Sequence, residues 1–401
     1  MKNWKRTFAV IWSGEFFSSL TSSITGFAII FWISLETRSP QVLALVFLTT
    51  FLPQLIFGLF TGVYVDRWNR KWVMIVSDLF MGTCTAALCV LFYFNKVEIW
   101  HIYLLSSLRS AGNAFYQPAM KASVPLLAPE DQLMRVSGVS QIIYSISNIA
   151  GPAIAAFLIT VLPMTFICAS EVLGAVMASV ALLFVVIPRP TKTNNTRTDF
   201  FNELKIGLQA IFQKKGMKWL FVSDLGAMFF ILPIAALFPL MTLDHFGGNT
   251  YQMSIVEIIW SAGMLAGGAL VSTNLLKKYN RVGIIALMCI IDGIAFLWSG
   301  LLPTDGYLWF AVFTAVSGVA AAIWNSAFTV IMQTSIDIEK QGRAFSTYDS
   351  LSLLPSIPGL LATGFIAETI GLTNSFVAAG AGILLIGFAI FFIPSVMALG
   401  K

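Results

Sequence analysis

The side chains of this sequence best suited to chemistry are charged residues that interrupt long apolar runs. Glu15 lies in the first run, Arg109 in the fourth and Asp224 in the seventh. If these runs cross a bilayer, each charge costs about 2.5–3.5 kcal/mol on insertion scales, which makes it a candidate functional residue. The chemistry expected of such groups is proton exchange or the binding of a cation.

Glu15 and Arg109 are expected to approach and neutralise each other if the first and fourth helices are neighbours. The pair would break when a proton or a cationic substrate takes the carboxylate; the alternative is a static ion pair that joins two helices. Asp224 is the corresponding acid of the seventh helix, and it either takes part in coupling or extends towards the cytoplasm. These three residues form the predicted proton-coupling set.

Four further acids lie in the apolar runs. Asp292 is deep in the ninth run, but nothing in the sequence indicates that it faces a cavity. Glu171 and Glu257 lie closer to the outer ends of their runs, and Asp78 lies closer to an inner end. A structural role is expected for these last three.

The elements that position these charges follow from composition. The chain has 401 residues, of which 57% are hydrophobic and 11% are charged, against about 25% charged in ordinary soluble domains. Apolar runs of about 18 or more residues recur along the chain, and a helix of about 20 residues spans the hydrocarbon core. The runs do not alternate polar and apolar residues as a β-barrel requires. The sequence therefore predicts an all-α polytopic membrane protein.

Twelve transmembrane helices are predicted, in two six-helix halves. Their ranges are 8–35, 41–64, 72–94, 99–120, 137–162, 165–187, 219–241, 252–275, 282–302, 307–334, 344–368 and 372–395. The N-terminal half is 1–187 and the C-terminal half is 219–401. Between them, 188–218 is a polar cytoplasmic linker that ends in an amphipathic helix on the membrane surface. The apolar face of that helix consists of Phe200, Leu204, Leu208 and Ile211.

The distribution of basic residues indicates the orientation. Of the 24 lysines and arginines, 21 fall at the termini or in segments on the same side, two (Arg38 and Lys96) fall on the opposite side, and Arg109 falls within a helix. By the positive-inside rule both termini face the cytoplasm, so the net charge of +5 reflects topology and not nucleic-acid binding. The basic start MKNWKRTF belongs to a retained first helix, because no small-residue cleavage site follows it.

The two halves resemble each other weakly, as an internal duplication would require. At an offset of 208 positions, three identities fall in the fifth helix of each half. They pair Arg135 with Arg343, Gly151 with Gly359, and Phe157 with Phe365. The tripeptide NRK at 69–71 has a faint counterpart in NRV at 280–282. Parallel repeats of this kind place the substrate site between the halves, near the bilayer midplane.

Several common catalytic motifs are absent from the sequence. It has no GxxxxGK[ST] loop, no GxGxxG after a strand and no nucleophile elbow, and His101 and His245 are far apart. The four cysteines lie in apolar runs without a CxxC pair, so neither a disulfide nor a metal site is expected. An ATP-driven pump, a hydrolase or a cofactor is not expected, and an ion gradient must supply any energy.

Aromatic and polar residues occur together on helices 4 and 10, in GNAFYQP and AIWNSAF. The predicted lining of a substrate cavity is Asn113, Tyr116, Trp324 and Asn325. An apolar pocket with a few polar groups suits a hydrophobic, drug-like ligand, whereas the alternative for each residue is ordinary packing.

The stretch GVYVDRWNRK, residues 62–71, follows the second helix. Its basic residues are what the positive-inside rule requires, whereas Gly62 and Asp66 need another reason. These basic residues are Arg67, Arg70 and Lys71. The spacing resembles the loop 2–3 signature of the major facilitator superfamily, glycine-x3-aspartate-basic-x-glycine-arginine-basic, with Asn69 in place of the second glycine. Asparagine tolerates a positive φ, so the turn is expected to form.

This resemblance implies an inner gate. Asp66 would face the cytoplasmic start of helix 11 near Arg343, where the helix dipole is positive, and Asp349 on that helix would pair with Arg70. Gly62 would let two helices approach closely, and inward opening would separate these contacts.

A second resemblance lies in SNIAGPAIAAF of helix 5. Gly151 and Pro152 match a signature that accompanies drug–proton antiporters in this superfamily, with Ala155 and Ala156 in place of the usual glycine pair. Arg109 resembles the helix-4 arginine implicated in proton coupling. The run LRSAGNAFYQPAMKASVPLLAPEDQLMR, together with ALFPLMTLDHFGG and EIIWSAGMLAGGAL, is most similar to the macrolide-efflux branch.

The resemblance implies a major facilitator fold and a secondary transporter of the cell (cytoplasmic) membrane, not an enzyme. It would export amphipathic, macrolide-like drugs by proton antiport with alternating access. Its partners would be a small amphipathic substrate, protons and membrane lipid, and the sequence does not decide whether an ATP-binding partner protein takes part. Two alternatives stay open. One is export of a siderophore or another metabolite on the same fold, and the other is a polytopic membrane enzyme that uses Glu15 or Asp292.

Overall fold

The computed structural model describes residues 4–400 apart from 128, 130–131, 188–199, 214, 274–278, 338–340, 342–343, 346 and 349–350. All regular secondary structure among the described residues is helical. The chain divides into two compact units. Unit 1 comprises Met1–Ile33 and Val46–Thr196, and unit 2 comprises Ser34–Leu45 and Arg197–Lys401. The turn between the first two long helices, Ser34–Leu45, therefore belongs with the second part of the chain.

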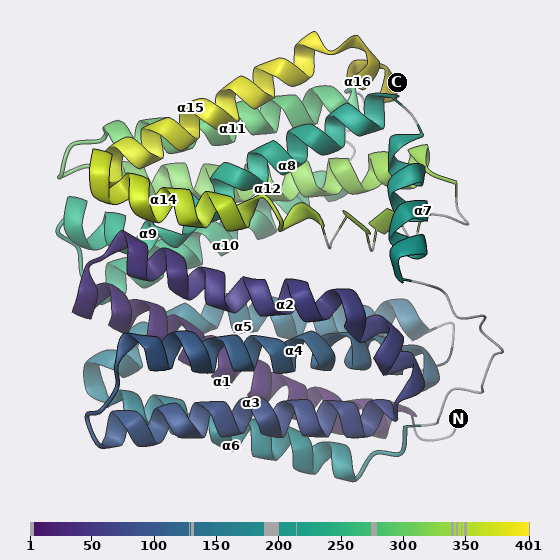
Figure 1. The fold of residues 1–401 in the computed structure, drawn as a ribbon, viewed down its shortest axis with the longest axis vertical. Helices are drawn as coiled ribbons and strands as arrows, with labels where there is room; N and C mark the ends of the chain where they lie inside the picture. Colours follow the sequence, from purple (N-terminus) through teal and green to yellow (C-terminus); the bar gives the residue numbers. More distant parts are fainter. Residues whose placement is uncertain are drawn as a thin grey trace. The chain divides into compact units, whose positions relative to one another are not determined.

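Unit 1 is built mainly from six long helices, coloured purple to teal in Figure 1. They are α1 (Trp4–Thr37), α2 (Pro40–Arg67), α3 (Arg70–Tyr93), α4 (Ile99–Leu127), α5 (Leu133–Val161) and α6 (Met164–Leu183). Within the unit α3 packs against both α4 and α6. Buried side chains from five helices form an apolar core that includes Phe8, Met74, Ala119, Val136 and Leu182.

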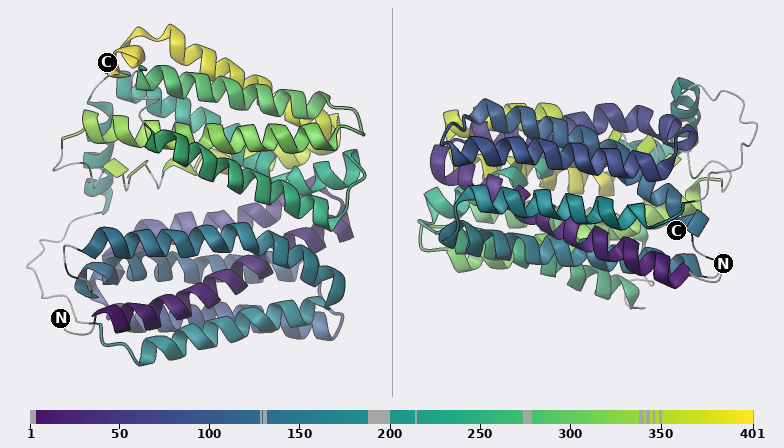
Figure 2. Two further views of the ribbon diagram at one scale, coloured as in Figure 1. Left: turned by 180° about the vertical axis from the view of Figure 1, so that it is seen from behind. Right: turned by 90° about the horizontal axis from the view of Figure 1, so that it is seen from below.

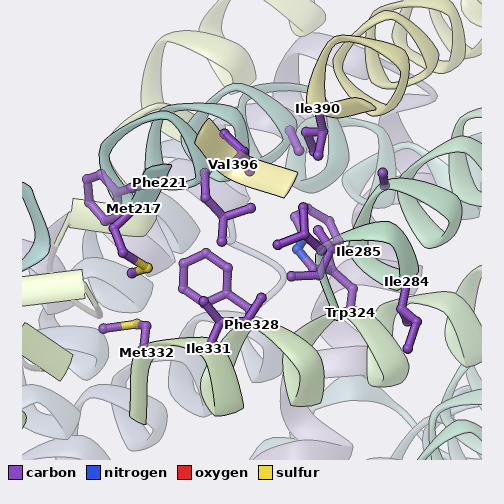
Figure 3. Packing of buried hydrophobic residues seen from close by; sticks show 14 of the residues in the cluster. Met217, Phe221, Ile284, Ile285, Trp324, Phe328, Ile331, Met332, Ile390 and Val396 are labelled. Atoms are coloured by element: carbon purple, nitrogen blue, oxygen red, sulfur yellow. The ribbon is translucent and has the colours of Figure 1, made fainter. Parts of the chain in front are cut away.

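Unit 2 contains the remaining helices. They are α7 (Phe200–Phe212), α8 (Lys215–Ala236), α9 (Phe238–Leu240), the π-helix η2 (Met241–His245), α10 (Thr250–Ser272), α11 (Arg281–Leu301), α12 (Tyr307–Ser335), α14 (Ser356–Ile370), α15 (Leu372–Phe392), α16 (Pro394–Met397) and the 3₁₀ helix η4 (Ala398–Gly400). Helix α11 packs along α12 and α15, and α10 packs along α12. Figure 3 shows part of the core of this unit, where Phe221, Trp324 and Phe328 lie together.

The prediction of an all-helical membrane protein is confirmed. Ten of the described helices are long and apolar enough to cross a bilayer, and the long helices of each unit lie roughly along one direction (Figure 2). The two other predicted spans are α4, which carries Arg109 and Asn113 in its middle, and the eleventh helix, which is interrupted.

Asparagine residues begin the third long helix of each unit. The side-chain oxygen of Asn69 accepts a hydrogen bond from the backbone N–H of Lys71 at 3.1 Å. The side-chain oxygen of Asn280 accepts from the N–H groups of Val282 and Gly283 at 2.9 and 3.1 Å. The weak similarity of NRK and NRV therefore has a physical cause, an N-cap that satisfies free donors at a helix start. The turn does not require a positive φ at Asn69, whose φ is −73°.

A turn at residues 353–355 interrupts the eleventh predicted helix. Pro355 and Pro358 lack the N–H that an α-helix needs at those positions. The backbone N–H of Ser356 bonds the carbonyl of Leu353 at 3.1 Å, in a tighter turn than an α-helix has. Helix α14 therefore begins only at Ser356 (Figure 1).

Helix α7, the predicted amphipathic helix, runs across the ends of the unit 2 helices (Figures 1 and 2). Ile211 is fully buried, Ala210 is 6% exposed, and both belong to the apolar core of unit 2. The ring of Phe212 meets that of Phe221 on α8 edge-on, with centroids 5.9 Å apart. This end of the helix therefore packs on protein, whereas the sequence predicted that the helix lies on the membrane surface. The side chains of 200–204 lie outside the described part of the chain.

Candidate functional site

Arg109 of α4 lies at the centre of a polar cluster inside unit 1. Its guanidinium forms a close ion pair with Glu171 of α6, and it also donates a hydrogen bond to Ser22 Oγ of α1 at 3.4 Å. The side chains of Arg109 and Glu171 are only 14% and 6% exposed. Because both charges are removed from water, loss of either partner would leave an uncompensated buried charge.

Glu15, the predicted partner of Arg109, forms no ion pair with it. Glu15 lies on α1, and its Oε2 is buried without a hydrogen-bond partner. The predicted pairing is therefore wrong, and Glu171, for which the sequence suggested a structural role, takes that place. The physical reason lies in helix packing. The rotation of each helix about its axis determines which acid faces Arg109, and Glu171 of α6 is the acid that does.

Asp78 of α3 adds a third carboxyl group to the cluster. It is 2% exposed, and it accepts hydrogen bonds from Ser18 Oγ at 3.3 Å and from Ser179 Oγ at 3.4 Å. Tyr116 interacts electrostatically with both Asp78 and Glu15, so these side chains share one region of the unit. The serine hydroxyls solvate the Asp78 carboxyl group but bring no positive charge.

The cluster has more acids than bases. Asp78 also interacts electrostatically with Glu171, and Glu15 lies near the same region through its interaction with Tyr116. Among the side chains described in this region, Arg109 is the one cation available to them. One guanidinium neutralises one carboxylate, so the other two need protons or a cationic ligand to avoid the cost of a buried charge. Among the described residues, no group of three or more His, Cys, Asp or Glu side chains is placed to hold a metal ion.

A polar stripe continues from Arg109 along α4. Asn113, Gln117 and Lys121 follow at intervals of about four residues, which places all of them on one side of the helix. Asn113 is half-buried, whereas Gln117 and Lys121 are exposed. Such side chains suit water or a polar ligand and not lipid, so the stripe indicates the side of α4 that a substrate path would use.

Unit 2 buries its acids with different partners. Asp224 of α8 and Asp292 of α11 are each 3% exposed. Ser317 Oγ of α12 donates a close hydrogen bond to Asp292, and Tyr348 is the hydrogen-bond partner of Asp224. The second carboxylate oxygen of Asp224, Oδ2, has no partner. Within the described spans of this unit, lysine and arginine occur only in first turns of helices, so hydroxyl groups take the role that Arg109 has in unit 1.

The predicted gate is described only in part. Gly62, Asp66 and Arg67 lie in the last turns of α2, but their side chains fall outside the described part of the chain. Arg343 and Asp349 also fall outside it. The contact of Asp66 with the start of the eleventh helix therefore stays a prediction.

The two basic residues after the turn anchor on helix ends of unit 1. Arg70 Nη1 donates to the carbonyl of Ala122 in α4 at 2.6 Å, and Lys71 Nζ donates to the carbonyl of Leu183 at 2.8 Å. Leu183 is the last residue of α6, where the helix dipole favours a cation. The pairing of Arg70 with Asp349 stays a prediction, since Asp349 is not among the described residues.

The helix-5 signature lies at a close helix contact. A Cβ atom on Gly151 would overlap Ser23 Oγ of α1, so only glycine permits this approach. The same hydroxyl donates to the carbonyl of Ser147 at 2.9 Å, one turn before Pro152. Gly151 thus lies where α5 meets α1, and the part of Gly151 and Pro152 in antiport stays a prediction.

The predicted cavity residues differ in accessibility. Tyr116 and Trp324 are 8% and 6% exposed and lie in the apolar cores of units 1 and 2, respectively; Figure 3 includes Trp324. Asn113 is half-buried on α4, and Asn325 is exposed on α12. The two amides are therefore more accessible to a ligand than the two aromatic rings, and a joint cavity stays a prediction.

The segment Ser34–Leu45 makes polar contacts that the sequence does not predict. Arg38 pairs with Asp244 of η2 at 3.5 Å, and Ser39 Oγ donates to Glu368 Oε1 of α14 at 3.3 Å. Burial raises the pKa of the Asp244 carboxyl group, and the Arg38 guanidinium partly offsets that rise. The one available signal was that Arg38 is one of two cations expected on the outer side.

Known proteins share this sequence pattern and this fold. The family model described as Major Facilitator Superfamily matches residues 11–360. Macrolide efflux protein A of Streptococcus pyogenes is 37% identical over 386 residues, which cover 96% of this chain and 95% of that protein. Multidrug efflux pump Tap of Mycolicibacterium fortuitum is 25% identical over 353 residues, which cover 86% of this chain and 85% of that protein. The crystal structure of the nucleoside transporter NupG matches with a TM-score of 0.76 at 13% identity, over 96% of this chain and 98% of that chain.

Proposed function

Because the chain belongs to the major facilitator superfamily, we propose that it exports amphipathic drugs, macrolides first, by proton antiport with alternating access. The resemblance to this family and to its macrolide-efflux members is confirmed, and the protein is a multi-pass membrane transporter, not an enzyme. The observation that carries the proposed substrate class is the 37% identity to Macrolide efflux protein A along nearly the whole chain. The proposed location is the cytoplasmic membrane, with both termini in the cytoplasm.

Proton coupling is proposed at Glu15 and Arg109, with Asp224 as the corresponding acid of unit 2. The support for it is the excess of buried carboxyl groups over the Arg109 guanidinium. In the proposed cycle a proton on Glu15 leaves Arg109 with Glu171. Loss of that proton makes Glu15 a competitor for the guanidinium, which changes how α1, α4 and α6 are held together.

Substrate contact is proposed at Asn113 and Asn325, whose amides can exchange hydrogen bonds with the hydroxyl and carbonyl groups of a macrolide. Tyr116 and Trp324 shape the apolar surroundings of those positions. The gate is proposed at Gly62–Lys71, with Asp66 opposite Arg343. The half-buried amide of Asn113 on α4 and the exposed amide of Asn325 on α12 support this assignment, because both are accessible polar groups on membrane-spanning helices.

The test is accumulation of labelled erythromycin, a macrolide, in energised cells with and without an uncoupler. Wild-type protein should lower accumulation, and the uncoupler should abolish that effect. Replacement of Glu15→Gln should remove export while purified protein still binds erythromycin, because the amide cannot release a proton. Glu36→Gln, an exposed acid on the same helix, is the matched control and should export normally.

Each outcome bears on one part of the proposal. If cells with the wild-type protein accumulate as much erythromycin as cells without it, the proposed substrate class is contradicted. A panel of siderophores and other metabolites would then identify the alternative substrate. Full export by the Glu15→Gln variant would contradict the coupling site. Asp66→Ala should reduce turnover without loss of protein from the membrane, and unchanged turnover would leave the loop a signal of topology alone.

A further inference from the structure

Two hydrogen bonds tie α8 to the interrupted helix of unit 2, one on each side of the turn at 353–355. On one side, Tyr348 is the hydrogen-bond partner of the Asp224 carboxyl group. On the other side, Ser356 Oγ, at the start of α14, donates to the carbonyl of Met228 at 3.2 Å. Met228 lies one turn after Asp224 on α8. The turn is therefore held between two anchors on the same helix.

The two anchors differ in chemistry. The bond from Ser356 ends on a backbone carbonyl, which carries the same partial charge at every pH. The bond from Tyr348 ends on a carboxyl group, which changes charge when it binds a proton. A turn with a fixed anchor on one side and a titratable anchor on the other has the parts of a hinge.

One carboxylate oxygen of Asp224 has no hydrogen-bond donor near it. The residue is 3% exposed, and its Oδ2 has no hydrogen-bond partner. The ring of Tyr348 stacks on Phe328 with centroids 4.7 Å apart and meets Phe221 edge-on at 6.0 Å. A metal ion would need several oxygen ligands, which these apolar side chains do not supply. A proton needs only the free oxygen.

Few other ionisable groups lie on the elements packed against Asp224. Cys289 of α11 interacts electrostatically with Asp224 and with Asp292. Helices α15 and α16 carry no ionisable side chain, and the one on α14 is Glu368 in its last turn. Lys205 of α7 is exposed. Among the described residues, Asp224 therefore has no cationic partner that would hold it charged.

We propose that Asp224 is a proton-operated latch on the turn at 353–355, with Tyr348 as the positioning residue through which it acts. The inference rests on the proposed proton coupling and deepens it by naming the element that the proton moves. In the deprotonated state, the carboxylate accepts the Tyr348 hydroxyl hydrogen in a charge-assisted bond, which holds the preceding segment on α8. A proton that binds Oδ2 forms the neutral acid, and the bond to Tyr348 loses roughly half its strength.

The latch acts where the helix is already interrupted, at the turn of residues 353–355. Because Pro355 and Pro358 remove two helix hydrogen bonds, bending at the turn breaks no regular helix. The Ser356 anchor keeps α14 in place while Tyr348 moves away from Asp224. One proton is taken up or released, the hydrogen bond from Tyr348 weakens or re-forms, and no other covalent bond is made or broken.

The test measures the hinge without any transport substrate. Spin labels are attached to the full-length chain in phosphatidylcholine–phosphatidylglycerol liposomes, at Val222→Cys on α8 and Leu354→Cys in the turn, both exposed positions. The four native cysteines are replaced by alanine. Distance distributions between the labels are recorded by double electron–electron resonance spectroscopy at a series of pH values from acidic to alkaline. The ratio of the two distance populations should change by about tenfold or more with pH.

The variants decide between a latch and a merely structural contact. Asp224→Asn should keep the acidic-pH distribution at every pH. Tyr348→Phe retains the ring packing on Phe328 but should weaken the response to pH, and it keeps the proposal testable if Asp224→Asn does not fold. Asp292→Asn is the matched control and should respond like the parent. A wild-type pH response in Asp224→Asn, or an unchanged one in Tyr348→Phe, would overturn the proposal.

This readout separates the latch from the proposed transport function. If erythromycin is not exported but the distances still follow the protonation of Asp224, the substrate proposal fails and the latch stands. If erythromycin is exported by proton antiport but the distances do not depend on Asp224, the latch fails and the transport proposal stands.

Discussion

The two units bury acids in their spans, but they differ in the groups that stabilise them. In unit 1 the Glu171 carboxylate is held by the Arg109 guanidinium. In unit 2 the Asp292 carboxyl group is held by the Ser317 hydroxyl. An ion pair loses most of its attraction when its acid is protonated, whereas a hydroxyl group bonds the acid in either state. Unit 1 is therefore the more sensitive of the two to the loss of one partner, and unit 2 can change protonation at a smaller energetic cost.

The same two units agree where the duplication aligns them. Gly151 of α5 lies against Ser23 of α1, and Gly359 of α14 lies against Phe229 of α8. In each unit the matched glycine thus makes a close contact with the first long helix of that half. The two contacts differ in what the glycine meets, a side-chain hydroxyl group in unit 1 and a backbone carbonyl in unit 2.

The largest expected effect comes from breaking the ion pair of unit 1. Glu171→Ala should lower the free energy of unfolding by about 3–5 kcal/mol, because it leaves the Arg109 guanidinium buried without its counter-ion. Thermal unfolding of the purified protein in detergent measures this change. The double variant Arg109→Met and Glu171→Met should recover much of the loss, since it removes both charges. Wild-type stability in Glu171→Ala would show that another acid, such as Glu15, replaces the lost partner.

The second effect concerns the matched glycines. Gly359→Ala should destabilise unit 2 by about 1–3 kcal/mol or more, because the new Cβ atom would overlap the Phe229 carbonyl oxygen, which cannot rotate away. Gly151→Ala should cost less, and Ser23→Gly should restore its stability by removing the hydroxyl group that the Cβ atom meets. Unfolding temperatures of the three variants test this order. An equal loss for both alanine variants would contradict the distinction between side chain and backbone.

Much of the fold was predictable because the bilayer fixes helix length. The apolar runs gave nearly every helix within a few residues, since about 20 residues must bury their backbone bonds in hydrocarbon. The interruption at 353–355 was also present in the sequence as Pro355 and Pro358, but apolarity alone does not distinguish a straight helix from a broken one. Hydrogen-bond capacity, and not hydropathy, decides that difference.

The site was predictable in its members more than in its pairing. Arg109 was identified because a charge inside an apolar run is costly to place in a bilayer and therefore indicates a function. The same argument identified Glu15. Their pairing failed because a sequence shows the depth of a residue but not the rotation of its helix. Glu171 was assigned a structural role for its position near a helix end, although its depth suits Arg109 well enough for contact.

A smaller effect is expected from the hydroxyl-bound acid of unit 2. Asp292→Asn should change the free energy of unfolding by about 1 kcal/mol or less, because the amide still accepts from Ser317 and the buried charge is removed. The unfolding temperature of this variant, beside that of Glu171→Ala, measures the contrast between the units. A loss at Asp292 as large as that at Glu171 would mean that the hydroxyl contact is as indispensable as the ion pair.

The smallest effect should follow the loss of the outer pair in Ser34–Leu45. Arg38→Ala should cost about 0–1 kcal/mol at neutral pH, because the side chains of Arg38 and Asp244 are 64% and 32% exposed. Without the guanidinium the raised pKa of Asp244 rises further, so the folded state binds its proton more tightly than the unfolded state does. The variant should therefore gain stability as the pH falls and lose it as the pH rises through that pKa.

Unfolding temperatures of Arg38→Ala and wild type across this pH range test the contribution of the ion pair. Lys96→Ala is the control, because it removes the other cation expected on the outer side. The difference between Arg38→Ala and wild type should vanish in acid, where Asp244 is protonated and the ion pair is absent in both proteins. Lys96→Ala should show no such trend, because the described residues include no ion pair to it. A loss in Arg38→Ala that persists unchanged in acid would assign the contribution of Arg38 to the packing of its side-chain stem and not to its charge.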